Sequence, residues 1–410
     1  MDNFSYIKEL DEELYNECHE AESMAKTKPN LSAKKLRDSL ERFLKVIVKS
    51  KGIPINEKTT TMEIMIRTLE KSKILTGSQS NDLHKIRMYC NEFSHSSEKN
   101  TDTTSAQIIP YFRSLHEIMH SYLSKNKKNN LVFDENSIPI GDFIPIKKLE
   151  VDKREACDKK YLCKKINPKT NSVVTYVIRQ FSRKNSKDHE NWLQRDEYAL
   201  EQLWLNEPNP RNVVQYHPIS TEENNNLFFT CYVMPENTQT LETLDKKILS
   251  NIDKLELLLG IANGINELHS LEEPIVHRYL APASVYVFET RTNKRTPKIG
   301  NFEYSKLINP FDGTVLNKYA NREDVYKAPE LMGHSGENWT AVDIYSFGVI
   351  ILYLFGLNLE GVLNANKLNS LGVSTEMVEL VKTMISPMQS KRPDIKKVMS
   401  IIEMEVHGSE

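Results

Sequence analysis

Three polar side chains within residues 81–95 have the chemistry to move protons and to hold anions. Arg87, Asn91 and His95 follow one another at intervals of four, which in a helix places them along one side over about two and a half turns. An imidazole titrates near neutral pH and suits proton transfer. A guanidinium holds a phosphate and the charge that builds on it, and an amide orients either group. These residues are therefore candidates for acid–base chemistry on a phosphate.

The helix that would carry these residues has a second, apolar side, which fits the core of a bundle and is formed by Leu83, Ile86, Cys90 and Phe93. With its polar positions it resembles the signature of HEPN-type domains, over roughly residues 10–124. The resemblance implies a helical bundle of the kind found in prokaryotic defence and toxin systems. It also implies a homodimer that cleaves RNA without a metal, since a base can remove the proton of the 2′-hydroxyl that DNA lacks.

One position departs from the active HEPN-type ribonucleases, in which an arginine directly precedes the central polar residue. Cys90 stands at that position, and Arg87 lies one turn earlier. A structural interpretation therefore stays open beside the catalytic one. In that interpretation His95 bonds the free carbonyls at the helix end, and Asn91 bridges within the bundle. Arg87 then pairs with Glu92 or with an acid on a neighbouring helix.

A second set of candidate residues lies in residues 275–287 and 299–303. The first segment resembles the catalytic loop of protein kinases, H-R-D-L-K-P-x-N, and the second resembles the D-F-G turn. The positions that carry the chemistry hold other residues. The base Asp, the Lys, the metal-binding Asn and the magnesium-binding Asp are replaced by Tyr279, Ala281, Ser284 and Asn301. The pattern predicts a kinase fold without kinase chemistry, in short a pseudokinase.

Residues that serve the structure of kinase domains are retained in order over roughly residues 140–405: His277, Arg278, Phe302, Glu330, Asp343 and Arg392. The resemblance implies that Asp343 holds the backbone of the catalytic loop. It also implies a buried ion pair between Glu330 and Arg392. Retained structural residues beside replaced chemical ones favour a folded regulatory module over an active kinase.

In the expected nucleotide cleft, too, residues that would act on the nucleotide are replaced. Arg179 replaces the strand Lys that grips phosphates, and Glu197 occupies the place of its helical partner, so we expect an Arg179–Glu197 pair. The loop at residues 149–156 contains acidic residues and no glycine, so its backbone cannot approach phosphates closely. The sequence therefore predicts no cofactor, no metal and no ATP binding.

The composition of the chain narrows the classes of protein to which it can belong. The 410 residues have a net charge of −2, with 39% hydrophobic and 27% charged residues, as in ordinary soluble proteins and unlike a general nucleic-acid or membrane binder. The five cysteines form no CxxC pair, which favours reduced thiols and a cytoplasmic location. The start of the chain lacks the features of a signal peptide, and no apolar run is long enough to span a membrane.

These patterns predict an α+β chain in which an all-α bundle precedes a bilobal kinase-like fold. The expected parts are a bundle at 1–124, a polar linker at 125–139, a small lobe at 140–235 and a large lobe at 236–405. Helices are expected at 5–26, 30–50, 61–75, 81–95 and 105–123.

Two functions stay open. The first is a bacterial defence or toxin protein in which the pseudokinase senses a trigger or a protein partner and controls a dimeric ribonuclease. The second is a non-enzymatic scaffold that binds a partner protein, nucleotide or nucleic acid. A third, a kinase with rewired chemistry, would need a substitute carboxylate, and only Glu303 lies near enough in the sequence.

Overall fold

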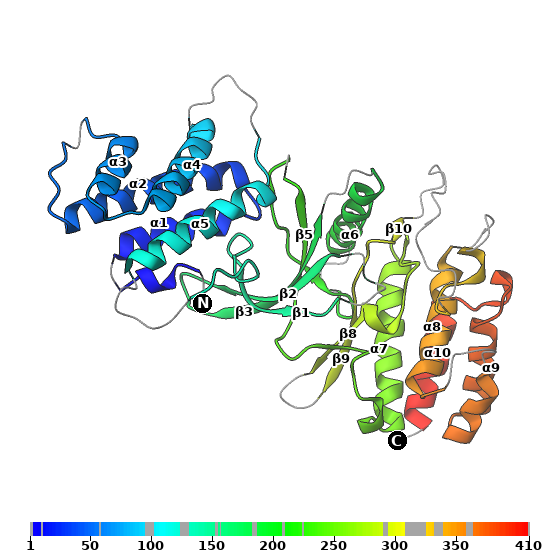
Figure 1. Cartoon of the computed structure of the whole chain (residues 1–410). Coiled ribbons are helices and arrows are strands. Elements are labelled where there is room, and N and C mark those ends of the chain that lie inside the picture. Colours follow the sequence, from blue (N-terminus) through cyan, green and yellow to red (C-terminus); the bar gives the residue numbers. More distant parts are fainter. Residues whose placement is uncertain are drawn as a thin grey trace. The chain divides into compact units, whose positions relative to one another are not determined.

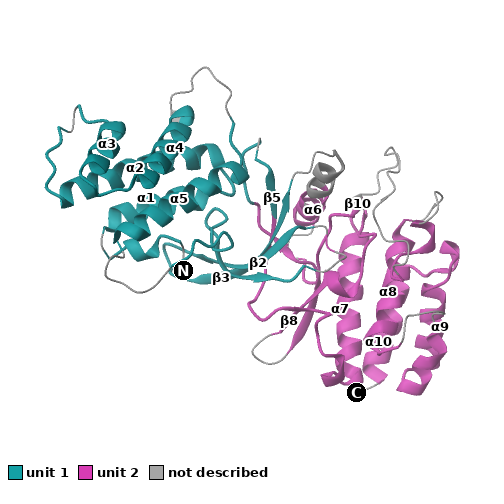
Figure 2. Ribbon diagram, viewed as in Figure 1, with its two compact units in different colours: residues 1–151, 157–184, 219–229 teal, residues 152–156, 185–218, 230–410 magenta. Residues whose placement is uncertain are grey.

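The computed structural model describes the chain except for residues 1–2, 10, 57–58, 95–101, 124–130, 152–154, 156, 183–186, 207–209, 224, 290–293, 308–324, 332–338, 358–363 and 409–410. The described residues form two compact units, drawn in teal and magenta in Figure 2. Unit 1 comprises residues 1–151, 157–184 and 219–229, and unit 2 comprises residues 152–156, 185–218 and 230–410.

Unit 1 begins with a helical region, blue to cyan in Figure 1. A short 3-10 helix, η1 (Ser5–Ile7), precedes α1 (Glu12–Met24), α2 (Pro29–Ser50), α3 (Met62–Lys71), α4 (Gly77–Ser94) and α5 (Ser105–Leu123). The apolar sides of these helices meet in one buried core that includes Leu36, Phe43, Ile66, Ile86 and Phe112. The predicted N-terminal helical region is therefore confirmed.

The first predicted helix is split where residue Asp11 adopts an extended backbone with φ −155°. Its carboxylate accepts the N–H of Leu14 and so caps the start of α1. Phe4 and Ile7, which precede this break, are fully buried in the bundle core. The chain therefore turns at Asp11 because the cap stabilises a new helix start and the preceding residues pack inward.

Unit 1 also contains an antiparallel meander of β1 (Ile144–Leu149), β2 (Lys159–Ile166) and β3 (Val173–Ser182). The first residues of β5 (Leu227–Val233) continue this sheet, and β4 (Gln215–Tyr216) pairs with the last residues of β5, giving the strand order β1-β2-β3-β5-β4. Phe133 and Ile138, on the chain between α5 and β1, belong to the bundle core. The bundle and the meander thus share one compact unit.

Unit 2 is mainly helical. Its helices are α6 (Lys187–Asn206), α7 (Asn251–His269), α8 (Thr340–Leu354), α9 (Thr375–Met384) and α10 (Ile395–Gly408). The 3-10 turns are η2 (Lys246–Ile248), η3 (Pro282–Ser284), η4 (Pro329–Leu331), η5 (Ala365–Leu371) and η6 (Gln389–Lys391). The remaining strands are β6 (Gln239–Thr240), β7 (Ile275–Val276), β8 (Val285–Glu289), β9 (Arg295–Ile299) and β10 (Lys306–Leu307).

Two features fix the core of unit 2. Helix α8 is buried on nearly all sides, as its apolar run from Val349 to Phe355 predicts. Helix α7 lies so close to the neighbouring backbone that a Cβ at Gly264 would be 2.7 Å from the carbonyl oxygen of Asn212. A larger residue there would push α7 away from strand β9 and from the segment before β4 that contains Asn212.

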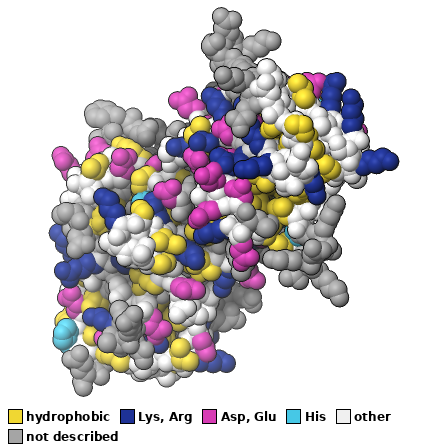
Figure 3. Space-filling view, turned by 90° about the vertical axis from the view of Figure 1, so that its left-hand side faces the viewer, with side chains coloured by type: hydrophobic (Ala, Val, Ile, Leu, Met, Phe, Trp, Pro, Cys, Tyr) yellow, Lys and Arg dark blue, Asp and Glu magenta, His cyan; other side chains and the backbone are white. Residues whose placement is uncertain are grey.

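The surface matches the near-neutral charge of the chain. On the face drawn in Figure 3, Lys and Arg side chains lie among Asp and Glu side chains. None of the described helices combines the length and the apolar character needed to cross a membrane.

Candidate functional site

The loop after β7 is built around one buried carboxylate. Asp343, on α8 and 1% exposed, accepts the backbone N–H of His277 at Oδ2 and that of Arg278 at Oδ1, both at 2.8 Å. The Nε2 atom of His269 lies 2.9 Å from the same Oδ2. A carboxylate that accepts several N–H groups is a strong and directional anchor. The geometry of residues 277 and 278 is therefore set from the core helix.

Arg278 extends this anchoring to the segment after β9. Its backbone adopts φ +63°, an uncommon conformation for a residue with a side chain. Its Nε donates to the carbonyl of Tyr304 at 2.7 Å. Burial, with help from the nearby Arg195 charge, lowers the pKa of Arg278 to about 10, so the guanidinium remains charged at neutral pH. The hydrogen bond is therefore charge-assisted and joins two loops that are remote in sequence.

His277 and Phe302 form the second link between these loops. The Nε2 of His277 lies 2.9 Å from the carbonyl oxygen of Gly300, and the His277 and Phe302 rings are 5.0 Å apart. Both side chains are at most 1% exposed. The loop and the turn are thus packed as one body.

The residues at the chemical positions take part in the same packing. Tyr279, which we predicted at the position of the base Asp, has its ring centre 4.6 Å from that of Tyr304, with the two rings tilted by 47°. The crevice lined by residues 278–281, Tyr326 and Lys327 has no room for a water molecule. A phenol hydroxyl is a much weaker base than a carboxylate, so it is a poor acceptor for a substrate proton.

Ser284 and Asn301, which we predicted at the two metal-ligand positions, bond to the protein. Ser284 Oγ donates to the carbonyl of Ala281 at 2.8 Å and accepts the N–H of Ala281 at 3.0 Å, which closes the turn η3. Asn301 Oδ1 accepts the hydroxyl of Tyr286 at 2.8 Å. Both side chains are nearly buried and neutral, whereas magnesium favours carboxylate oxygen. Glu303, the remaining carboxylate of this turn, is only 1% exposed.

A buried ion pair connects η4 to the segment before α10. Arg392 donates from Nη1 and Nη2 to the two carboxylate oxygens of Glu330 at 2.6 and 2.9 Å. Burial alone would raise the pKa of Glu330, but the hydrogen bonds from Arg392, from the backbone and from Gln389 and the charge of Arg392 together outweigh it and hold that pKa below its usual range. Arg392 also donates to the carbonyls of Ala341 and Ser386 at 2.9 and 2.8 Å. Its donors are thus spread over three segments.

The two residues expected at the nucleotide position lie in different units. Arg179, on β3 in unit 1, is fully buried, with its guanidinium 5.1 Å from the ring centre of Phe181. Glu197, on α6 in unit 2, is exposed and accepts the hydroxyl of Tyr216 at 2.5 Å. Their pairing stays a prediction. Residues 152–154 and 156 of the glycine-free loop lie outside the described residues.

The candidate ribonuclease residues lie on α4, apart from His95, which is outside the described residues. Arg87 Nη2 lies 3.5 Å from Glu63 Oε2 on α3. Asn91 Oδ1 accepts the Nε of Arg37 on α2 at 3.0 Å. Arg87 therefore has the acid on a neighbouring helix that the structural interpretation expects. Arg37 was missed from the sequence, because nothing in the pattern of α2 aligns it with residues on α4.

Sequence reasoning also missed the contacts between the bundle and the meander of unit 1. Lys26 is 3% exposed, and its Nζ donates to the carbonyl of Ile138 at 3.0 Å and lies 4.9 Å from the ring centre of Tyr161 on β2. Glu222 accepts the N–H groups of Asn30 and Leu31 at 2.9 and 3.3 Å, at the start of α2. One feature could have indicated the Glu222 contact: α2 lacks a capping side chain of its own, so its first N–H groups need an acceptor from elsewhere.

The fold and its retained anchors are those of a protein kinase domain, and comparison with known proteins agrees. The family described as the protein kinase domain matches residues 161–401, which is more than half of the chain. The chain therefore belongs to the protein kinase domain family.

Individual relatives are also kinases. The chain is 32% identical over 111 residues to a probable serine/threonine-protein kinase of Dictyostelium discoideum, covering 27% of this chain and 10% of the relative. It is 27% identical over 183 residues to the probable serine/threonine-protein kinase PBL20 of Arabidopsis thaliana, covering 44% and 43%. It is 24% identical over 241 residues to the serine/threonine-protein kinase Nek4 of Mus musculus, covering 55% and 28%. The matched regions thus span less than half of each relative.

Proposed function

We propose that the kinase-like domain of this chain does not transfer phosphate and instead serves as a regulatory binding module for the helical bundle. The observation that carries the proposal is the bonding of the substituted residues. The ring of Tyr279 packs against Tyr304, and the polar atoms of Ser284 and Asn301 bond to neighbouring protein groups. These side chains complete the fold at the positions where a kinase holds its base and its magnesium.

The energetics support the same view. Phosphoryl transfer depends on positioning and on magnesium to neutralise the charge of the transition state. Loss of one such electrostatic group typically lowers the rate by about a hundredfold to a thousandfold. In this chain the base and both metal ligands are changed together, and such losses are not simply additive. Among the described residues of this turn, the carboxylate of Glu303 is 1% exposed, so it is not accessible as a replacement.

The regulatory part of the proposal rests on contacts within unit 1. Lys26 bonds the chain before β1 and lies over Tyr161 on β2, while Glu222 bonds the first N–H groups of α2. A change in the meander of the kinase-like domain therefore acts directly on the position and the stability of α2. Since α2 carries Arg37, which bonds Asn91 on α4, the same path reaches the polar face of the bundle.

A phosphotransfer assay tests the first part. The full chain is incubated with γ-labelled ATP and Mg²⁺ or Mn²⁺, with casein and myelin basic protein as acceptors and an active kinase as positive control. We expect no label above the background of Asn301→Ala. The proposal fails if the wild type labels itself or an acceptor and Asn301→Ala abolishes the label while its melting temperature is unchanged.

Metal-independent RNA cleavage by the bundle, as a HEPN-type homodimer, is a second candidate function. Its support is the arrangement on α4, where Asn91 accepts from Arg37 and Arg87 lies one turn away on the same side. Two arginines near one amide favour binding of a phosphate. His95 then takes the role of the proton-transfer group. The ion pair of Arg87 with Glu63 is the competing, structural use of the same side chain.

Cleavage of total RNA and tRNA in EDTA tests this candidate. Arg37→Ala, Arg87→Ala and His95→Ala should each abolish cleavage, while Arg113→Ala on α5, which removes an exposed arginine paired with Glu135, should not. Light scattering on the same samples reports whether the chain is a dimer. If the wild type does not cleave RNA, this candidate fails and the scaffold function remains, in which the bundle binds a protein, nucleotide or nucleic acid.

A further inference from the structure

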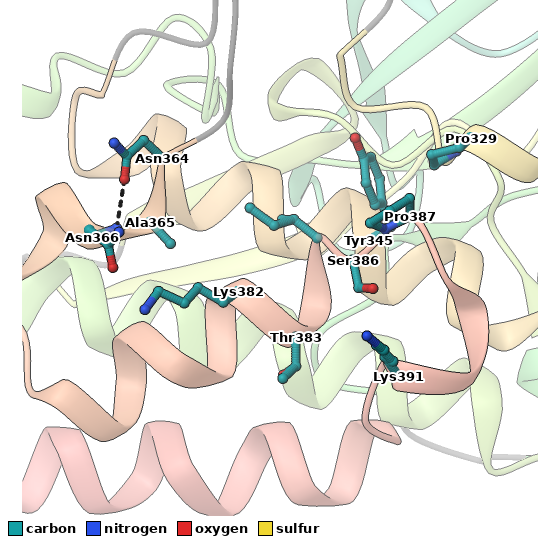
Figure 4. Close-up of a pocket in the computed structure, with 11 residues that line it drawn as sticks. Pro329, Tyr345, Asn364, Ala365, Asn366, Lys382, Thr383, Ser386, Pro387 and Lys391 are labelled. Atoms are coloured by element: carbon teal, nitrogen blue, oxygen red, sulfur yellow. Dashed lines mark hydrogen bonds between the residues drawn. The ribbon is translucent and has the colours of Figure 1, made fainter.

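A cavity of about 610 Å³ opens on the surface of unit 2, and its described lining residues do not include the substituted loop residues. It is lined from five elements, η4, α8, η5, α9 and η6, and from the chain that follows α9. Figure 4 shows the lining side chains around one hollow, with Asn364 on one side, Pro329 and Tyr345 on another, and Lys382 and Lys391 on the side of α9. Its volume is in the range of ligand-binding pockets.

The lining has an apolar part and a polar part. The apolar part consists of Pro329, Ala365, Ile385 and Pro387, with the ring of Tyr345. The polar part consists of amides, hydroxyls and two ammonium groups, from Asn364, Asn366, Thr383, Ser386, Lys382 and Lys391. None of the described lining residues is acidic, so this lining is complementary to an anion that also carries an apolar group.

The cavity is held in shape by the surrounding core. Arg392 bonds the carbonyl of Ser386 at 2.8 Å and lies 5.0 Å from the ring centre of Tyr345. A Cβ at Gly348 would lie 2.8 Å from Ile385 and 2.9 Å from Met384, so α8 and the end of α9 approach closely at this point. The lining is therefore preformed, which lowers the entropic cost of binding.

The lysines can reach a ligand at small cost. Lys382 pairs with Glu379 one turn earlier on α9, where the side chains are 38% and 60% exposed. Surface pairs of this kind contribute little, so an incoming carboxylate can replace Glu379 as the partner. Lys391 is exposed at the end of η6.

The apolar surface continues beyond the cavity itself. Met388 directly follows the lining residue Pro387 and is 58% exposed. A ligand that covers both the cavity and Met388 is longer than a small molecule that fills the cavity alone. This extension favours a segment of polypeptide.

We propose that this cavity is a docking site for an acidic peptide segment of a protein partner. One apolar side chain of the segment enters the cavity between Ile385 and Pro387, and flanking carboxylates pair with Lys382 and Lys391. The inference goes beyond the function proposed above, because docking at this site requires neither the presence nor the absence of phosphoryl transfer.

Fluorescence anisotropy of the full chain with a labelled peptide tests the site. The probe is a nine-residue peptide of alternating Glu and Asp with one central Phe, and the comparison peptides replace that Phe by Ser or every acid by Lys. We expect binding of the Phe probe to be at least tenfold tighter than binding of either comparison peptide. Equal binding of the Phe and Ser peptides would overturn the proposal.

Two variants examine the two halves of the cavity. The double substitution K382S/K391S removes the positive charges, and Thr383→Trp fills the hollow from an exposed position on α9 without changing charge. Each of these variants should bind the Phe probe at least tenfold more weakly than the wild type does. The matched control K396S/K397S removes two exposed lysines on α10 that do not line the cavity, and it should bind as the wild type does.

A competition assay distinguishes a peptide ligand from a small anionic ligand. Benzoate and phenyl phosphate should displace the probe only at concentrations at least a hundredfold above that of unlabelled peptide. Displacement by either at the peptide's own concentration would overturn the peptide proposal in favour of a small aromatic anion. Since no nucleotide is present, a negative result here leaves the phosphotransfer prediction untouched.

Discussion

Substitution of Lys26 by methionine should change how the stability of the bundle depends on pH. The Nζ of Lys26 is enclosed between the carbonyl of Ile138 and the ring of Tyr161, and the residue is 3% exposed. Burial lowers the pKa of Lys26 from 10.5 to about 8, which the nearby Lys159 charge assists and Glu22 and Asp134 oppose. Lys26 is therefore still protonated at neutral pH, and its buried charge lowers the stability of the folded state.

The direction of the effect follows from the two pKa values. Because the folded pKa lies below the unfolded one, unfolding takes up a proton between about pH 8 and pH 10.5, and a rise in pH through this window favours the folded state. At about 1.4 kcal/mol per unit, the whole shift corresponds to about 3 kcal/mol. Between pH 7.5 and 9.5 the free energy of unfolding should therefore rise by roughly 2 kcal/mol.

The assay is urea unfolding followed by the helical circular dichroism, at several pH values from 7.5 to 9.5. Lys26→Met has no proton to take up, so the stability of the wild type relative to this variant should rise with pH by roughly 2 kcal/mol. Lys34→Met, an exposed lysine on α2, is the matched control and should follow the wild type. A constant or falling difference between wild type and Lys26→Met would refute the burial of a charged lysine.

Three further substitutions report on the anchors of the fold. Asp343→Ala should destabilise unit 2 by at least about 3 kcal/mol in urea unfolding, because two buried N–H groups lose their acceptor; a loss below 1 kcal/mol contradicts the anchoring role. Arg392→Met should lower stability by about 3–5 kcal/mol by leaving Glu330 buried without its partner, and adding Glu330→Gln should restore part of the loss in a double-mutant cycle. Glu222→Gln should weaken the cap on α2 and lower the free energy of unfolding by about 1 kcal/mol in urea unfolding, whereas Glu223→Gln next to it should have less effect.

Much of the architecture was accessible from the sequence because it depends on local pattern. The apolar positions Leu36, Leu40, Phe43 and Leu44 repeat with helical spacing, and all four are buried in α2. The protein kinase domain was accessible for a different reason, since its motifs keep a fixed order along the chain. Neither kind of signal depends on knowing which distant residues meet.

The contacts that were not predicted join residues far apart in the chain. Glu222 caps a helix that starts more than 190 residues earlier, and its own neighbourhood in the sequence is a polar loop without any motif. Arg37 meets Asn91 through the packing of α2 on α4, which depends on the rotation of both helices. A periodic pattern identifies the buried side of each helix but leaves open which polar residues at its edges will meet.

The retained and the substituted residues of the kinase-like domain bear on function in different ways. Asp343 accepts backbone N–H groups, and Arg392 bonds Glu330 and a backbone carbonyl, so these residues support the fold whether or not the chain transfers phosphate. Their presence is therefore no argument for catalysis. Positions 279, 284 and 301 are different, because we predict them to be the positions at which an active kinase holds its base and its metal. Tyr279 and Asn301 instead contribute a ring contact and a buried hydrogen bond. Restoring Asp at both positions would remove these contacts, so such a variant should be less stable than the wild type even if it gained affinity for magnesium.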